Sequence, residues 1–328
     1  MLLTPAPLSL LGVIPALLAQ LVQMTMILAL SPLLTGLVRK VRARLQRRRG
    51  ASLIQPYRDL RRLLNKEAVI ADNASWLFRA APYFIFAATW VAAALVPTFA
   101  ANLLFSWSGD LIAITALLGS ARFALALAAM DIGTSFGGIG ASREMMIASL
   151  AEPAMLMIVF SVALIAGSTQ LSAIATFMLS GHGGLRVSLG LALVALVIVA
   201  VAENGRIPVD NPATHLELTM VHEAMVLEYS GRYLALIELA AALKLTLYIA
   251  MITCVFFPLG MATDVSDAPG DLIGTIAWLI KMAAAAIALG IAETSVAKMR
   301  VFRVPNFLGA ALMLGLLGVL LLFVSRGM

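Results

Sequence analysis

The order of apolar and polar positions along the chain predicts a bundle of membrane-spanning helices. Uncharged apolar runs of roughly 20 residues recur from one end to the other, and a helix of that length crosses the apolar part of a bilayer. We therefore expect an all-α polytopic membrane protein. No repeat, low-complexity tract or linker divides it, so residues 1–328 are expected to form one membrane domain. Eight spans are predicted, at residues 10–37, 79–101, 110–130, 143–166, 186–203, 235–261, 271–292 and 305–325.

The fourth span follows a glycine-rich segment, DIGTSFGGIGASREM, at residues 131–145. Its glycines predict a pliable turn that lets the backbone approach a neighbouring segment closely. A helix is expected to start after this turn, with Ser142 as its N-cap, and Pro153 inside the span predicts a bend or a partly interfacial course. The segment lacks the strand–loop–helix context and the lysine of a phosphate-binding loop, so we expect no nucleotide site.

The composition supports a membrane protein and excludes several alternatives. Hydrophobic residues make up 62% of the chain and charged residues only 12%, which is typical of polytopic membrane proteins. The first apolar run continues to Val38 without a charged segment before it, so we expect a retained span and no cleaved signal. The single cysteine, Cys254, can neither ligate an iron–sulfur cluster nor form an internal disulfide.

Lysine and arginine are distributed unevenly between the two sides of the predicted bundle, and this bias sets its orientation. Residues 38–79 carry twelve of them, and with eight spans one side receives eighteen in all against two on the other. We therefore expect both termini outside and the loops 38–79, 131–145 and 203–232 in the cytoplasm. The net charge of +6 comes mainly from the first of these loops, so nucleic-acid binding is not expected.

The first cytoplasmic loop contains an amphipathic segment. From Tyr57 to Leu64, apolar residues alternate with arginines at helical spacing. Such a helix lies on a membrane surface or beneath a partner protein. Alternatively, its arginines only keep this loop on the cytoplasmic side of the membrane and contact anionic lipids. These arginines are Arg58, Arg61 and Arg62.

The loop at residues 203–232 gathers five carboxylates and two of the three histidines beside the membrane, where charge is costly and suggests function. Prolines and a glycine restrict its backbone, and a solvated loop is the alternative. No zinc-type spacing such as HExxH is present, so we expect proton-relaying histidines and no metal site. The residues are Glu203, Asp210, His215, Glu217, His222, Glu223 and Glu228.

Six further charged residues fall within or at the ends of the predicted spans. Each costs roughly 2.5–3.5 kcal/mol when it faces lipid, so we expect all six to face the protein interior. With Glu203 they form either a chain of titratable sites through the membrane or static ion pairs that fix helix packing. No arrangement for covalent chemistry is present, so no catalytic residue is expected. The six are Arg122, Glu152, Glu238, Lys244, Lys281 and Glu293.

Three cytoplasmic motifs carry a family resemblance. They are ENGRIPVD at 203–210 with EYSG at 228–231, Arg48-Arg49-Gly50 with Gln55-Pro56 and Asp59, and the segment 131–145 with Glu152-Pro153. These motifs resemble the subunit 1 family of respiratory NADH:quinone oxidoreductase (complex I), and more closely its hydrogenase-4 component C and formate hydrogenlyase subunit 4 branch. The acidic run departs from the family pattern, since Ala213 and His215 stand where glutamates are expected.

The resemblance implies a non-catalytic membrane subunit that docks a cytoplasmic redox arm and couples its electron transfer to proton translocation. The arm is implied to contain hydrogenase-like small and large subunits and a ferredoxin-like subunit. These partners are implied to hold iron–sulfur clusters and, in the hydrogenase form, a nickel–iron site, with no cofactor in this chain. Antiporter-like membrane subunits and the inner (cytoplasmic) membrane of a prokaryotic cell are implied as well.

Two alternatives stay open at this point. One is a stand-alone secondary ion or proton transporter, and the other is the same subunit beneath a quinone-reducing or other non-hydrogenase arm. The docking residues that the resemblance implies are Arg48, Arg49, Gln55, Arg58, Asp59, Arg61, Arg62, Arg143 and Glu144.

Overall fold

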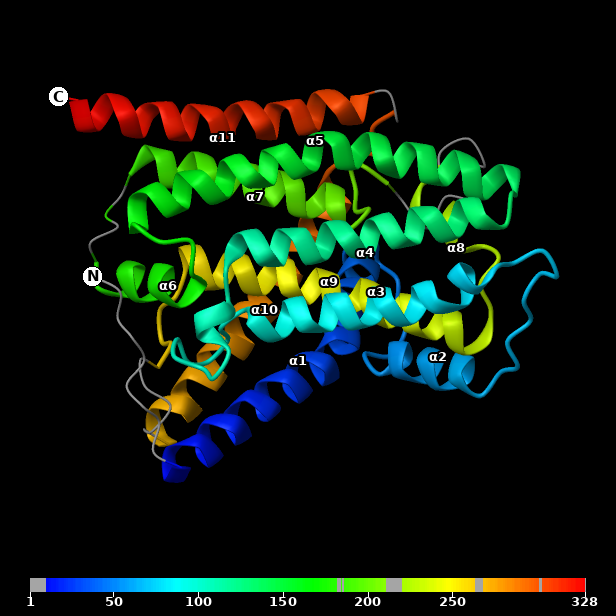
Figure 1. Cartoon of the computed structure of the whole chain (residues 1–328), viewed down its shortest axis with the longest axis horizontal. Coiled ribbons are helices and arrows are strands. Elements are labelled where there is room, and N and C mark those ends of the chain that lie inside the picture. The colour runs from blue at the N-terminus through cyan, green and yellow to red at the C-terminus, as the bar shows by residue number, and fades with distance from the viewer. Residues whose placement is uncertain are drawn as a thin grey trace.

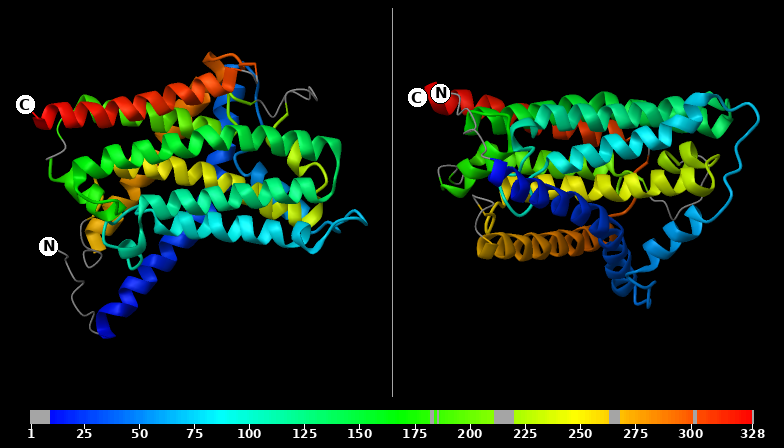
Figure 2. Two further views of the ribbon diagram at one scale, coloured as in Figure 1. Left: turned by 45° about the horizontal axis from the view of Figure 1, so that its top comes forward. Right: turned by 60° about the horizontal axis from the view of Figure 1, so that its bottom comes forward.

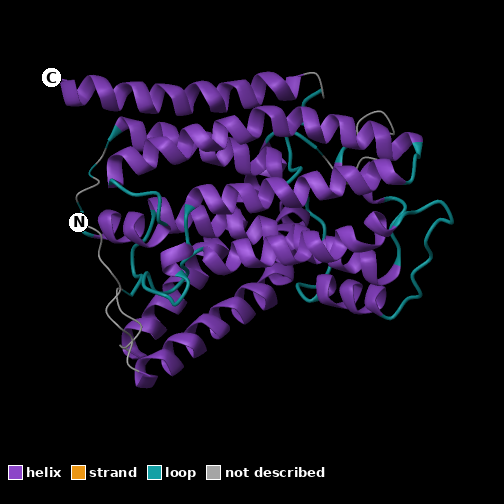
Figure 3. Ribbon diagram, viewed as in Figure 1, coloured by secondary structure: helices purple, strands orange, loops and turns teal. Residues whose placement is uncertain are grey.

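The computed structural model describes residues 10–181, 184, 186–210, 220–262, 268–300 and 303–327. Within these ranges the chain is helical, and its only extended pairings are two isolated bridges (Figures 1 and 3). Seven of these helices are long and apolar enough to cross a membrane, and an eighth is apolar but shorter. The prediction of an all-α polytopic membrane protein is confirmed. The eight are α1 (Leu10–Leu45), α3 (Trp76–Leu95), α4 (Leu111–Asp131), α5 (Ser135–Ala166), α7 (Val187–Glu203), α9 (Gly231–Phe256), α10 (Ala268–Ser295) and α11 (Val304–Gly327).

Short helices lie between the long ones. The amphipathic segment of the first loop forms α2 (Gln55–Leu64), which buries Pro56 and leaves its arginines exposed. The apolar helix α6 (Leu171–Leu179) was not predicted, because nine residues are too few to register as a separate span. A helix of one turn, α8 (His222–Val226), lies in the acidic loop.

Several predicted boundaries need correction. The helix α1 continues to Leu45, so the first residues of the predicted loop 38–79 are helical. The helix α9 begins at Gly231 and ends at Phe256, both earlier than predicted. Charged side chains at the end of α1 and the start of α9 extend into water, so hydropathy alone underestimates how far a helix continues beyond the membrane. At its other end α9 stops before Pro258, which cannot continue the hydrogen-bonding pattern of the helix.

The start of α5 also differs from the prediction. The N-cap is Thr134, whose Oγ1 accepts a hydrogen bond from the Gly137 amide at 3.2 Å. The predicted cap, Ser142, lies inside the helix, and its hydroxyl donates to the Ile139 carbonyl at 3.0 Å. Helix therefore extends through most of the glycine-rich segment. Gly140 keeps its predicted role of close approach, since a Cβ there would lie 3.0 Å from the Val221 carbonyl.

Most of the long helices run roughly side by side, while α1 lies oblique to them, and the bundle has two distinct ends (Figures 1 and 2). The beginning of α1 and the end of α11 lie at the left end in Figure 1. The loop between α2 and α3 and the turn between α4 and α5 lie at the right end. This arrangement places the basic first loop and the glycine-rich turn together, opposite the described ends of the chain.

Two loops at the right end are fastened to each other through the start of α9. The Ser230 hydroxyl donates to the Val69 carbonyl and accepts from the Val69 amide, both at 2.8 Å. Tyr229 donates a hydrogen bond to the Phe78 carbonyl at 3.0 Å, and its ring stacks on that of Phe78 with centroids 3.9 Å apart. Burial raises the pKa of Tyr229, so its hydroxyl stays a donor at every physiological pH.

The turn between α4 and α5 is attached to the same place. Asn73 donates from its side-chain amide to the Ile132 carbonyl at 2.6 Å, and the Asp131 carboxylate accepts from the Ser75 amide at 2.9 Å. We call the segments 65–75, 131–134 and 227–231 the loop platform. Because side-chain hydrogen bonds join all three, the platform is a fixed surface at one end of the bundle.

Candidate functional site

Arg122 of α4 lies at the centre of a buried ion cluster. Its side chain is 4% exposed and forms ion pairs with Glu203 at the end of α7, with Glu144 at 3.6 Å and with Glu152 at 3.9 Å. Glu203 and Glu144 are buried as well. One guanidinium can pair with several carboxylates because its positive charge is spread over three nitrogens that point in different directions.

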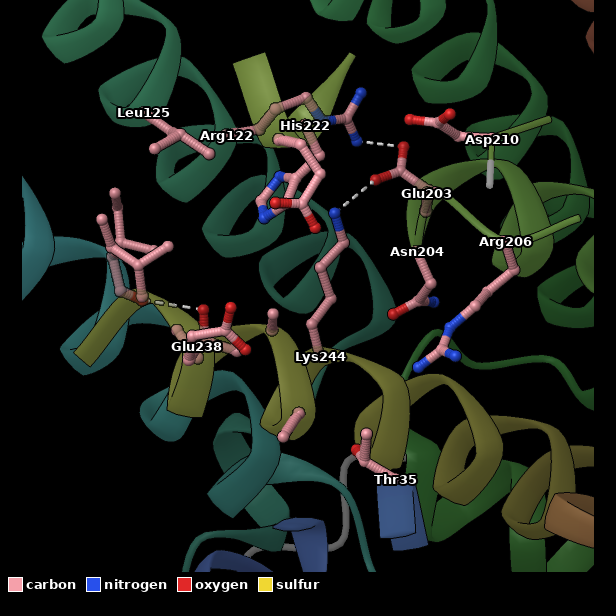
Figure 4. A pocket seen from close by; sticks show the side chains of 18 of the residues that line it. Thr35, Arg122, Leu125, Glu203, Asn204, Arg206, Asp210, His222, Glu238 and Lys244 are labelled. Atoms are coloured by element: carbon pink, nitrogen blue, oxygen red, sulfur yellow. Dashed lines mark hydrogen bonds and ion pairs between the residues drawn. The ribbon is translucent and has the colours of Figure 1, made fainter. Parts of the chain in front are cut away.

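A second cation completes this cluster. The ammonium of Lys244, on α9, lies 3.2 Å from Glu203 Oε2, so Glu203 is paired on both oxygens (Figure 4). The cluster therefore contains three carboxylates and two cations, and its charges sum to −1 when every group is ionised. Buried net charge is unfavourable, so binding one proton would neutralise the group.

The cluster borders a cavity of about 470 Å³. Its lining combines residues of α2 and the C-terminal half of α1, such as Asp59 and Thr35, with the buried ions. Figure 4 shows Glu203, Lys244 and His222 around this space. A cavity of this volume with charged groups along its walls has room for several water molecules, which can carry protons between side chains that do not touch.

A second ion cluster lies at the start of the acidic loop. Glu293 of α10, with a side chain only 2% exposed, pairs with Arg42 of α1 at 3.4 Å and with Arg206 at 3.3 Å. Burial lowers the pKa of Arg206. The negative charge of Glu293 raises this pKa in part, and the positive charges of Arg39 and Arg42 lower it further. This group joins α1 and α10 to the loop.

A third contact fixes the other side of the loop. Asp210 is buried, pairs with Lys298 at 3.1 Å and accepts a hydrogen bond from the Val221 amide at 3.3 Å. The Met299 amide donates to the Pro208 carbonyl at 2.8 Å. The loop is therefore held by the segment after α10 at both of these points, unlike a solvated tether.

His222 begins α8 and lines the cavity. Burial lowers its pKa below the usual value, and the charge of Lys244 lowers it further, while Glu238 and Asp210 act in the opposite direction. The imidazole is therefore neutral at pH 7, with one nitrogen able to accept a proton. Glu223 and Glu238 line the same cavity.

Residues 17–324 match the model of a protein family described as NADH dehydrogenase. The chain is 32% identical over 286 residues to formate hydrogenlyase subunit 4 of Escherichia coli (strain K12), a match that covers 87% of this chain and 92% of that protein. The chain belongs to the NADH dehydrogenase family. Hydrogenase-4 component C of the same organism is 34% identical over 280 residues, which are 85% of this chain and 87% of that protein. The resemblance seen in the motifs is confirmed.

A solved structure in this fold is similar to the chain over most of its length. It belongs to the membrane-bound sulfane sulfur reductase (MBS), an archaeal respiratory membrane complex, and the comparison gives a TM-score of 0.79 at 20% sequence identity. The match covers 93% of this chain and 99% of that one. At this identity the likeness establishes the shared fold.

The NADH dehydrogenase family motifs occupy defined places in the structure. The ENGRIPVD motif starts in the buried Arg122 cluster, with Glu203, and ends at the Asp210 pair. The EYSG motif supplies Tyr229 and Ser230 to the loop platform. Glu228 is exposed there and does not line the cavity. The predicted coupling residues His215 and Glu217 lie outside the described residues.

Two of the intramembrane charges do not face the interior as expected. The Glu152 side chain is 48% exposed, although it also reaches Arg122. Lys281 is partly exposed, and its ammonium donates to the carbonyls of Phe257 and Leu259 at 3.0 and 2.9 Å. Lys281 therefore satisfies carbonyls at the end of α9, where a cation is favourable, and contacts neither carboxylate cluster.

The predicted docking residues divide into two groups. The arginines of the first loop and α2 are exposed, and Asp59 accepts a hydrogen bond from Gln55 at 3.0 Å and pairs with Arg62 at 3.6 Å. Glu144 is instead buried in the Arg122 cluster, and Arg143 donates to the Met220 carbonyl at 2.8 Å. The structure thus places both residues within α5, which already starts at Ser135, with Glu144 inside the bundle and Arg143 against the acidic loop. The exposed arginines are Arg48, Arg49, Arg58, Arg61 and Arg62.

Sequence reasoning missed the partners that hold the acidic loop. Arg42 and Lys298 contributed only to the count of basic residues that sets the topology, and Arg206 was considered only as a partner for carboxylates of its own loop. Each of the three pairs with a buried carboxylate, and the partner of Arg206 is Glu293 of α10. Pairing with a carboxylate far away in the chain leaves no local signal. Among the described residues, no group of three histidine, cysteine or acidic side chains is arranged to hold a metal ion.

Proposed function

We propose that this chain is the membrane subunit that anchors a cytoplasmic hydrogenase-type redox arm and couples its electron transfer to proton translocation. The relatives at 32% and 34% identity are a subunit of formate hydrogenlyase and a component of hydrogenase-4, which favours such an arm over a stand-alone transporter. The arm would supply the iron–sulfur clusters and the nickel–iron site. Antiporter-like subunits would continue proton transfer in the membrane of a prokaryotic cell.

The observation that carries the proposal is the position of the Arg122 cluster. It lies inside the bundle, it includes Glu203 of the loop that bears the family motif, and its charge sum leaves room for one proton. The cavity connects it to residues of α2, beside the basic loop. A change of charge or position at the cytoplasmic surface therefore has a short path to groups that can take up or release a proton.

Docking is assigned to the exposed arginines of the first loop and α2, toward the end of the bundle that lies at the right in Figure 1. These exposed arginines provide a cationic face for an acidic partner, and charged surfaces guide association. We take this end as cytoplasmic, because eighteen basic residues lie on that side of the predicted topology and two on the other.

The test is to replace Arg48, Arg49 and Arg58 together with alanine and to purify the complex from membranes. The expected result is loss of the soluble arm while the chain stays in the membrane, since hydrophobic spans insert on their own. Arg186→Ala, an exposed arginine near the opposite end, is the control and should retain the arm. An arm that survives salt washing on the triple variant would show that these arginines only set topology.

A further inference from the structure

The Glu152 carboxylate lies on the outer surface of α5, at a depth where the bundle is expected to meet lipid. Its side chain is 48% exposed, and a Cβ added at Gly119 of α4 would lie 3.2 Å from its Oε1. Gly119 follows the first residue of α4, Leu111, by eight positions, which corresponds to about 12 Å of helix. Glu152 is therefore well inside the apolar layer and not at its edge.

The interior of the chain compensates this charge only in part. The nearest cation is Arg122, whose Nη1 lies 3.9 Å away and has no hydrogen-bond partner. The same guanidinium already pairs with Glu203 and Glu144. An uncompensated charge facing lipid costs roughly 2.5–3.5 kcal/mol, and such side chains normally face protein.

The surroundings of Glu152 are small and polar. Gly119 lies next to it, and Ser149 and Pro153 are exposed on the same helix. Small side chains let a second helix approach closely, and polar groups hold helix pairs together in membranes. The exposed face of α10 differs, since it presents large apolar side chains such as Ile276 and Ile280.

We propose that the face around Gly119, Ser149 and Glu152 binds a transmembrane helix of another membrane subunit, and that this helix brings a lysine or arginine to Glu152. The inference rests on the proposed function, because it requires a partner within the membrane. Glu152 then lies between Arg122 on the inside and the partner's cation on the outside. It becomes the point at which the buried cluster touches the neighbouring subunit.

The first test uses dicyclohexylcarbodiimide, a lipid-soluble reagent that modifies protonated carboxyl groups accessible from the bilayer. The intact complex is labelled in membranes, and this chain is labelled again after detergent has removed the other membrane subunits. We expect mass spectrometry to find Glu152 protected in the complex and modified in the freed chain. Modification in the intact complex, or in neither sample, would overturn the proposal.

Buried Glu203 reports whether the freed chain is still folded, since its side chain is only 2% exposed and should not react. If Glu203 is modified, the freed chain has unfolded, and a second test on the intact complex replaces the first. A photoreactive benzoylphenylalanine replaces Ser149 in the intact complex, with Ile280 as the lipid-facing reference. We expect Ser149 to capture a transmembrane peptide of another subunit that contains a lysine or arginine, whereas adducts with lipid alone would refute the interface. Neither test involves turnover, so a failure here is distinct from a failure of coupling.

Discussion

Lys244 and Glu203 connect α9 to the end of α7 across the cavity, with 3.2 Å between Nζ and Oε2. Glu203 is also paired with Arg122 on its other oxygen. The two cations therefore share one carboxylate, while Arg122 alone serves Glu144 and Glu152. Removal of Arg122 should therefore destabilise the chain more than removal of Lys244, because only Arg122 pairs with more than one carboxylate.

The first prediction concerns this inequality. Arg122→Ala leaves buried carboxylates without their main partner, and removal of one member of a buried pair costs about 3–5 kcal/mol. Lys244→Ala leaves Glu203 paired with Arg122, so the loss should be smaller. Thermal unfolding of the chain in detergent measures both, with exposed Arg61→Ala as the control. A larger loss for Lys244→Ala would show that Arg122 is not the centre of the cluster.

The second prediction concerns the loop platform. Gly231 has a φ of +54°, and a Cβ there would lie 2.8 Å from the Lys66 carbonyl oxygen. Gly231→Ala should destabilise the chain by about 1–2 kcal/mol for the backbone conformation alone, with the clash in addition. Limited proteolysis of the segment 65–75 should become faster, because α9 no longer fits against it.

Gly138→Ala is the matched control for this substitution. Gly138 lies in α5, and an added Cβ would meet no atom within 4 Å. Alanine in a helix is favoured over glycine by about 0.5–1 kcal/mol, so this variant should be slightly more stable. Equal behaviour of the two variants would contradict the packing described for Gly231.

The third prediction is a pH dependence set by His222. Burial lowers its pKa below the usual 6.5, so the unfolded chain binds a proton at a higher pH than the folded chain does. The free energy of unfolding is therefore unaffected by this group above pH 6.5 and falls as the pH drops below about 6.5. His222→Gln should flatten that part of the curve, measured by thermal unfolding from pH 7.5 to about pH 5, above the carboxylate range. An unchanged slope would mean that His222 is not buried from solvent.

Most of the fold was predictable, because a span of about 20 apolar residues leaves a signal in any sequence. The charges of the site were predictable for the same reason, since charge stands out within an apolar run. Their pairing was not, because Arg122, Glu144 and Glu203 lie on three helices, and no local pattern records which helices touch. Burial was equally hidden, so Glu144 was placed on the surface and Glu152 inside.

The fourth prediction is topological. A reporter fused after Arg62, in α2, should be cytoplasmic, and one fused after Gly181, beyond α6, should be external. The helices α2 and α6 lie toward opposite ends of the bundle (Figure 1). Fusions at Asn211 and Asp267, outside the described residues, are predicted to be cytoplasmic and external. Reporters at Arg62 and Gly181 on the same side would contradict the eight-span arrangement.

The last prediction separates charge from packing in the Arg122 cluster. Glu203→Gln leaves two carboxylates and two cations, so the cluster becomes neutral and loses the place for an extra proton. Glutamine keeps the shape of glutamate, so assembly and electron transfer to an artificial acceptor should stay near normal. Proton translocation into membrane vesicles should fall strongly, because the titratable group is gone.

Exposed Glu67→Gln, on the same side of the bundle but away from the cavity, is the control and should translocate normally. Glu228→Gln tests where protons enter the route to Glu203, because Glu228 is exposed on the loop platform. Reduced translocation by this variant would place the entry at segment 227–231. Failure of Glu203→Gln to assemble would make this carboxylate a structural anchor. Normal translocation by the assembled Glu203→Gln complex would exclude Glu203 from the route and leave Glu238 and His222, across the cavity, to carry it.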